Sequence, residues 1–326
     1  MTLRETIMEG LKEGVETDLS SLAMRAGVDR RLVLEACLLL EKRGILKVKK
    51  PLFGIFGDFR VVRVRDFSAE EKDSIRPRII AVANQKGGVG KTITAINLAG
   101  CLSRMGKRTL LVDMDPQAYS TSSLVSGKAS KTAYEVLVEG AQPDKAVVKT
   151  GFQSLDVLAS SVNLVGAEVE LVGMKGREGV LKKALDRIGG SYDYVVIDCP
   201  PSLSLLTINA LCACDGVLVP VQCDYFAFEG LRQLLDTIGL VRERLNGNLR
   251  LLGILLTMYE PQNPLSVRIA EEARKKFKGA VLKPMIHRDS VLSEAARQRK
   301  PIVYFDEDCR ASREYIEVAS FIVQNG

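Results

Sequence analysis

From about residue 78 onward, short continuous apolar runs alternate with longer helical patterns. The runs lie at residues 79–83, 108–117 and 192–202, and each one leads into polar residues. Continuous Val, Ile and Leu are typical of parallel strands that are buried on both faces. A helical pattern follows the first run, at residues 93–106. The alternation predicts an α/β fold with a mostly parallel, doubly wound sheet.

The first 65 residues have a different pattern. Helices are predicted over 2–14, 18–28 and 29–45, with Asp18 as the N-cap of the second helix and Gly27 in the turn that follows it. Residues 46–64 predict a β-hairpin whose turn lies near Gly57. Three helices and a two-stranded wing resemble a winged helix-turn-helix. We therefore expect a small domain over 1–65, a polar linker over 66–77 and a larger domain over 78–326.

Composition narrows the class of protein. Apolar residues make up 46% of the chain, and no apolar run approaches the roughly 18 residues of a membrane span. The N-terminus carries acids and lacks the apolar centre of a signal peptide. The seven cysteines form no CxxC pair, and we expect them to be reduced core residues of a cytoplasmic protein. A single histidine, His287, makes a histidine-based metal site unexpected.

Residues 86–92, KGGVGKT, lie between the first predicted strand and the first predicted helix of the larger domain. Glycines at this position let consecutive N–H groups point at an anion, and the helix N-terminus adds positive potential. Lys91 supplies a charge for the terminal phosphates of a nucleotide, and the Thr92 hydroxyl is a ligand for Mg²⁺. The general P-loop pattern has Gly where this chain has Gln85, and the chain carries a second lysine, Lys86. The motif predicts a P-loop NTPase.

Acidic residues end the next two predicted strands, where open α/β sheets bind ligands. Asp198 suits the role of holding Mg²⁺ through its water shell. Asp115 suits orienting or activating the attacking water, with a possible second contact to the metal through water. Two interpretations are open for Asp113 and Asp115, because either residue can instead cap the turn that follows its strand.

Together, NQKGGVGKT, VDMDPQ and DYVVIDCPPSLSLLTINAL resemble the ParA/MinD family of deviant Walker ATPases, and within it the ParA (Soj-like) partition branch. The segments 251–259 and 293–306 resemble later parts of ParA. The resemblance implies an ATPase that uses ATP and Mg²⁺ and forms a homodimer with ATP, in which Lys86 reaches the partner's phosphates. It also implies that Thr257, Met258 and residues 284–287 lie near the base.

The expected site follows from the motif and the resemblance together. The catalytic residues are Lys86, Lys91 and Asp115, and the expected metal contacts are Thr92, Asp198 and Asp115. The expected nucleotide-binding residues are Lys86, Gly87, Gly88, Val89, Gly90, Lys91, Thr92, Ile93, Thr257 and Met258.

Basic residues are concentrated in the predicted wing. Between Lys42 and Arg65 there are eight basic residues and one acid, a net charge of +7 in a chain of net charge +6. Such a segment suits contact with DNA phosphates. The expected DNA contacts here are Arg30, Arg31, Lys47, Lys49, Lys50 and Arg60. The open alternative is a solvated hairpin in a domain that binds protein.

A second concentration lies between Arg274 and Lys300, again with a net charge of +7. ParA proteins bind DNA without sequence preference through this part of the dimer, and the resemblance implies contacts from Arg288, Arg297, Arg299 and Lys300. Two arginines common in the family are absent, because Gln262 and Val291 stand in their places. A solvated face is the open alternative.

The expected function is an ATP-dependent, dimerising, DNA-binding ATPase of the ParA type that acts in plasmid or chromosome partition. Its hydrolysis is expected to be slow and stimulated by a ParB-like activator, at the nucleoid in the cytoplasm and not at a membrane. The first alternative is a MinD-like or other ParA-like ATPase that positions a non-DNA cargo. The C-terminal segment EYIEVASFIVQNG lacks the cationic face of a MinD-type membrane helix. A reductase or metal-delivery relative needs paired cysteines, which the sequence lacks.

Overall fold

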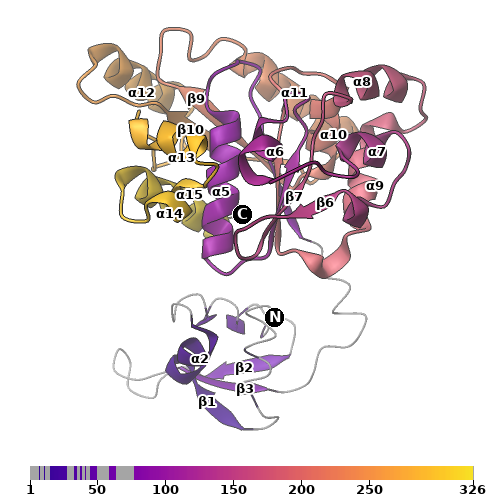
Figure 1. Ribbon diagram of the computed structural model, residues 1–326. Coiled ribbons are helices and arrows are strands. Elements are labelled where there is room, and N and C mark those ends of the chain that lie inside the picture. The colour runs from indigo at the N-terminus through magenta and orange to yellow at the C-terminus, as the bar shows by residue number, and fades with distance from the viewer. Residues whose placement is uncertain are drawn as a thin grey trace. The chain divides into compact units, whose positions relative to one another are not determined.

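A computed structural model describes residues 15–27, 45–49, 59–63 and 77–325. It also describes single positions, namely Ile7, Leu11, Val33, Leu34, Cys37, Leu38 and Glu41. The chain divides into two compact units (Figure 1). One comprises Met1–Ile75 with Met105–Arg108, and the other comprises Arg76–Arg104 with Thr109–Gly326.

The first unit contains a three-stranded antiparallel sheet in the order β1-β3-β2. Its strands are β1 (Glu16–Asp18), β2 (Leu46–Lys49) and β3 (Arg60–Arg63), and helix α2 (Leu19–Ala26) follows β1 directly. The Asp18 side chain accepts a hydrogen bond from Ser21 N at 2.7 Å, and Gly27 ends α2 with φ 65°. The prediction that Asp18 caps this helix and that Gly27 lies in the turn after it is therefore confirmed.

Strand β1 has no counterpart among the predicted elements. Its three residues, Glu-Thr-Asp, carry no alternation of apolar and polar side chains, and the strand exists through its pairing with β3. The core of this unit is apolar and includes positions from the first and third predicted helices. Most of those two helices, the hairpin turn, residues 66–76 of the linker, and Arg30, Arg31 and Lys50 lie outside the described residues.

The second unit is built on a seven-stranded sheet in the order β10-β9-β4-β8-β5-β7-β6. All neighbouring strands are parallel except β6 and β7. The strands are β4 (Arg78–Val82), β5 (Thr109–Asp113), β6 (Val147–Lys149), β7 (Leu155–Leu158), β8 (Tyr194–Asp198), β9 (Gly216–Gln222) and β10 (Arg250–Thr257). The prediction of an α/β fold with a mostly parallel sheet is confirmed.

Helices cover both faces of this sheet (Figure 1). Parallel connections are right-handed, and the β4-to-β5 and β8-to-β9 connections run in opposite directions along the sheet, so their helices α5 and α10 lie on opposite faces. Helices α14 and α15 pack against α5, while α9 and α11 pack against α10. The helices are α5 (Lys91–Arg104), α6 (Tyr119–Leu124), α7 (Ala133–Leu137), α8 (Leu164–Val172), α9 (Val180–Asp186), α10 (Leu205–Ala213), α11 (Leu231–Arg244), α12 (Pro264–Lys276), α13 (Ser290–Arg297), α14 (Ile302–Phe305) and α15 (Arg310–Asn325).

Close packing against the C-terminal helices fixes the position of α5. A Cβ atom on Gly100 would lie 2.4 Å from Cβ of Pro301, so only glycine fits at this point of the helix. The Asn97 side chain accepts a hydrogen bond from Ile302 N at 2.6 Å. Because the P-loop runs directly into α5, these contacts also hold the end of the loop in place.

Candidate nucleotide-binding site

The glycine-rich loop joins the carboxyl end of β4 to the first residue of α5. Gly88 and Gly90 have φ values of 75° and 87°, which residues with a Cβ atom rarely adopt. A Cβ atom placed on Gly87 or Gly88 would meet no other atom within 4 Å, so open space lies beside the loop backbone. A curled backbone with free space at a helix N-terminus is suited to a phosphate group.

Lys91 is the first residue of α5, directly after this loop, and is only 7% exposed. Its Nζ donates a hydrogen bond to the Lys86 carbonyl at 2.9 Å. Burial lowers the pKa of the Lys91 ammonium, and the nearby Asp198, Cys199 and Asp115 partly oppose this shift. The loop therefore holds a shielded cation next to the two acids predicted from the sequence.

Lys86 is the other lysine of the motif, and its side chain is bound by a residue outside the loop. Its Nζ donates to both carboxylate oxygens of Asp224, at 2.8 and 2.9 Å. Asp224 follows β9, which is the strand next to β4. The two lysines thus have separate partners within the chain.

Asp198 ends β8 and is fully buried. Its Oδ2 accepts a hydrogen bond from Ser120 Oγ at 2.7 Å, whereas its buried Oδ1 accepts none from any residue that the structure describes. Burial is the main cause that raises the pKa of Asp198, and the neighbouring hydroxyls of Ser120 and Thr92 oppose it. A buried carboxylate oxygen without a donor, close to a threonine hydroxyl, fits a hydrated Mg²⁺ ion.

Asp113 lies beside Asp198 in the sheet register. Its Oδ1 accepts from Asp115 N at 3.1 Å, and its Oδ2 accepts from Thr121 N and Oγ1 at 2.8 and 2.7 Å. Burial and the charge of Asp198 raise the pKa of Asp113. These contacts favour the turn-capping interpretation for Asp113.

Asp115 follows the end of β5 by two residues and is 7% exposed. Its Oδ1 accepts from Gln117 N at 2.9 Å, and its main-chain carbonyl accepts from Ser160 Oγ at 2.6 Å. Within the described part of the chain, no donor contacts its Oδ2. One carboxylate oxygen is therefore used to position the side chain, and the other is free to contact a water molecule.

Thr257 ends β10 and Met258 follows it, and both lie beside the loop. Thr257 is 2% exposed, and its hydroxyl donates to the Val89 carbonyl at 2.9 Å. Met258 has φ 51°, and its Cε lies 3.9 Å from the position of a Cβ atom on Gly90. Thr257 supports the loop through its hydrogen bond, and the contact of both residues with a base stays a prediction.

Sequence reasoning missed four polar residues of this region. Ser120 contacts Asp198, Thr121 contacts Asp113, Ser160 contacts the Asp115 carbonyl, and Asp224 contacts Lys86. None of them belongs to a motif, and each contact joins segments that are distant in sequence or separated by a turn. No signal in a single sequence marks them.

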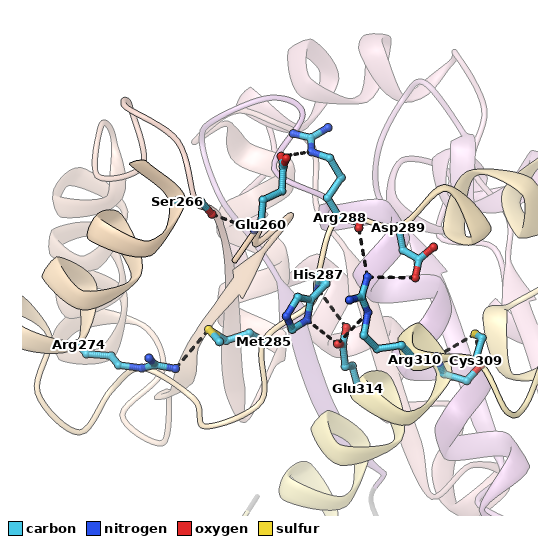
Figure 2. Close-up of polar contacts among 11 residues, drawn as sticks. Glu260, Ser266, Arg274, Met285, His287, Arg288, Asp289, Cys309, Arg310 and Glu314 are labelled. Atoms are coloured by element: carbon cyan, nitrogen blue, oxygen red, sulfur yellow. Dashed lines mark hydrogen bonds and ion pairs between the residues drawn. The ribbon is translucent and has the colours of Figure 1, made fainter. Parts of the chain in front are cut away.

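The C-terminal basic region extends from α12 to the residues that follow α13, and Figure 2 shows two of its arginines, Arg274 and Arg288. Arg274 lies on α12, while Arg288 precedes α13 and donates to Glu260 at 2.6 Å. Arg297 ends α13 and pairs with Glu294 at 2.6 Å. Arg299 and Lys300 follow with exposed side chains. Residues 297–300 form an exposed basic segment, and Glu260 and Glu294 partly balance the charges of Arg288 and Arg297.

His287 lies in the segment that resembles the base-binding region of ParA. Its Nδ1 is 2.6 Å from Glu314 Oε1, and Glu314 Oε2 accepts a hydrogen bond from His287 N at 3.0 Å (Figure 2). The ring packs edge-on against Tyr259 at 5.2 Å between ring centres. These contacts tie the segment to α15.

In the first unit, Glu16 of β1 pairs with two of the predicted DNA contacts. Lys49 of β2 donates to Glu16, and Arg60 of β3 pairs with it at 3.1 Å. These two pairings lower the pKa of Glu16. Lys47, also on β2, is exposed. Glu16 therefore partly balances the positive charge that the local sequence count assigns to β2 and β3.

The described residues contain no group of three or more His, Cys, Asp or Glu side chains placed to hold a metal ion. A Mg²⁺ ion bound through one hydroxyl and water does not need such a group. No helix in the same residues is long and apolar enough to span a membrane.

Comparisons with known proteins agree with this geometry. A family model described as an AAA domain matches residues 77–251. The sporulation initiation inhibitor protein Soj of Bacillus subtilis is 47% identical over 251 residues, which cover 76% of this chain and 99% of Soj. The chromosome partitioning protein ParA of Caulobacter vibrioides is 44% identical over 250 residues, which cover 76% of this chain and 94% of ParA.

A solved structure of similar fold is cobyrinic acid a,c-diamide synthase from Mycobacterium smegmatis, with a bound ATP analogue and magnesium. The two structures match with a TM-score of 0.68 and 36% sequence identity. The match covers 76% of this chain and 95% of the synthase chain. The P-loop, the strand order of the seven-stranded sheet and the similarity of the chain to the partitioning proteins lead to one assignment. This chain belongs to the ParA/MinD family of P-loop ATPases, the family of its relatives Soj and ParA.

Proposed function

We propose that the chain is an ATP-dependent, dimerising, DNA-binding ATPase of the ParA type that acts in plasmid or chromosome partition. The observation that carries the proposal is the loop with two lysines, one shielded inside it and one directed away from it. Two relatives with 47% and 44% identity are a Soj protein and a chromosome partitioning protein.

The phosphates of ATP fit the space beside Gly87 and Gly88, with Lys91 as their cation. Thr92 and Asp198 would hold Mg²⁺, which supplies positive charge against the phosphates when it is bound. Asp115 has one free carboxylate oxygen and is held in position by its turn, so it orients and activates the attacking water. Slow hydrolysis stimulated by a ParB-like activator is part of the proposal.

Lys86 gives the reason to expect a dimer. Lys91 already serves the phosphates of its own subunit, and the Lys86 side chain points to Asp224 instead. In a dimer with two nucleotides at the interface, each Lys86 can neutralise phosphate charge on the other subunit, as an arginine finger does.

The Lys86→Ala variant should bind ATP but remain monomeric with it, because the charge that bridges the interface is absent. Light scattering with ATP and with ADP measures this directly, and the parent chain should dimerise only with ATP. Lys128→Ala, which removes an exposed lysine elsewhere, serves as the control and should dimerise like the parent. ATP-dependent dimers of Lys86→Ala would contradict the proposal.

DNA binding is assigned to two surfaces. The first is the exposed segment 297–300 together with Arg288, which would bind any duplex in the dimer. The second is the small N-terminal unit, for which we propose a winged helix-turn-helix domain over residues 1–65, joined by the linker 66–77 to the ATPase domain over 78–326. The three-stranded sheet and the helix that follows β1 support this assignment.

Reversing charge at Arg297, Arg299 and Lys300 together should weaken binding to random duplex DNA by about 10- to 100-fold at low salt. Neutralised phosphates release counterions, so the log–log salt slope should also fall by roughly one for each phosphate that is no longer neutralised. Fluorescence anisotropy over a salt series measures both quantities. A control with Lys128, Lys131 and Lys145 changed to Glu should bind like the parent chain. Equal binding by both triple variants would show that segment 297–300 is only a solvated face.

We further propose a cytoplasmic, nucleoid-associated location. It rests on the proposed DNA contacts.

A further inference from the structure

Asp224 holds the Lys86 ammonium with both carboxylate oxygens, at 2.8 and 2.9 Å. The two side chains are 24% and 33% exposed, so the ion pair is partly shielded from water. The ring of Phe226 adds a further contact, with its centre 5.9 Å from Lys86 Nζ. The side chain that is proposed to reach a second subunit is therefore engaged within its own chain.

The backbone of Lys86 is anchored separately from its side chain. Lys86 N donates to Asn84 Oδ1 at 3.1 Å, and Asn84 Nδ2 in turn donates to the Pro220 carbonyl at 2.7 Å. The Lys86 carbonyl accepts from Lys91. Only the side chain of Lys86 is free to change partner, so its reach depends on whether Nζ leaves Asp224.

The loop that carries Asp224 faces solvent beside Lys86. Asp224 N donates to the Gln222 carbonyl at 2.9 Å, and the Asp224 carbonyl accepts from Ala227 N at 3.0 Å, so the turn is well ordered by its own bonds. The next two residues, Tyr225 and Phe226, are 75% and 56% exposed. Asp224 is thus a fixed acceptor at an open surface.

We propose that Asp224 is a positioning residue that restrains Lys86 in the monomer and competes with the phosphates of a second subunit for the same ammonium. The proposal rests on the proposed ATP-dependent dimer. A single ammonium cannot contact both anions fully, so each Lys86 must leave Asp224 before it reaches the other subunit. Asp224 therefore raises the concentration of ATP-bound chain at which dimers form.

The test compares Asp224→Asn with the parent chain in the presence of ATPγS. The dimer dissociation constant should fall by about three- to fivefold, while the affinity of the monomer for ATP stays the same. Asp236→Asn removes a similar charge from the exposed face of α11 and should change neither quantity. Adding Asp224→Asn to Lys86→Ala should not restore dimers, because the effect acts through Lys86.

A second readout does not depend on dimers. Acetylation of Lys86 by an N-hydroxysuccinimide ester, followed by mass spectrometry of the nucleotide-free chain, should be about threefold faster in Asp224→Asn. Unchanged labelling would overturn the restraint. If Lys86 were labelled faster in Asp224→Asn but this variant dimerised no more tightly than the parent, the proposed competition between Asp224 and the phosphates of the second subunit would be overturned. A parent chain that stays monomeric with ATP would overturn the proposed dimer and the competition with it, while the labelling rates would still judge the Asp224 contact.

Discussion

The Lys91→Ala variant should bind ATP about 10- to 100-fold more weakly than the parent chain, the change expected on removing a charge-assisted hydrogen bond to phosphate. Lys91 is the shielded cation inside the loop, and its Nζ is held there by the Lys86 carbonyl. Removing it leaves the phosphates without their closest positive charge. Isothermal titration with ATP in the presence of Mg²⁺ measures the change.

The same variant also tests whether the loop keeps its shape. Lys91 partly offsets the buried charges of Asp198 and Asp115, so thermal unfolding of Lys91→Ala must be followed alongside binding. Lys128→Ala is the matched control and should bind ATP like the parent. If Lys91→Ala were folded and bound ATP with parent affinity, the phosphate site would have to lie elsewhere.

The Asp115→Ala variant should bind ATP and form dimers, but hydrolyse ATP about 100- to 1,000-fold more slowly. The contacts that hold the nucleotide in the ground state remain, and only help in the transition state is removed. Phosphate release under saturating ATP measures the rate, and light scattering measures the dimer. Dimers of this variant should persist long after those of the parent have dissociated.

Asp115→Asn separates charge from structure. The asparagine side chain keeps an acceptor for Gln117 N, the bond that positions residue 115, but carries no negative charge. It should be as slow as Asp115→Ala. If Asp115→Asn hydrolysed ATP at the parent rate while Asp115→Ala did not, hydrolysis would depend on the hydrogen bond to Gln117 N that orders the turn and not on the charge of Asp115. If both kept the parent rate, the role of contacting water would have to move to another residue.

The larger domain could be predicted from the sequence because its signals are local. Strands buried on both faces must be continuously apolar, so β4, β5 and β8 coincide with the three predicted runs, although the runs at 108–117 and 192–202 extend four residues past the ends of β5 and β8. The P-loop is contiguous in sequence, and its glycines are required by backbone angles that other residues avoid. Both signals, the continuous apolar run and the glycine-rich motif, lie in neighbouring residues, so they can be recognised without knowledge of the fold.

The strand order and the polar partners could not be predicted in the same way. Strand β8 lies between β4 and β5 in the sheet, although it follows both by a long stretch of chain. Strand β1 is too short and too polar to have a pattern of its own, and only its pairing with β3 defines it. The contact of Ser120 with Asp198 joins residues 78 positions apart.

By itself, then, the sequence determined the P-loop, the buried strands and the acids at their ends, because each depends on a local pattern of burial or backbone freedom. Only the tertiary structure decided how the charged groups are paired. It placed Lys86 on Asp224, Arg288 on Glu260, and Lys49 and Arg60 on Glu16. A charged side chain on a surface can pair with any opposite charge that the fold brings near, and hydrophobic periodicity does not specify which one.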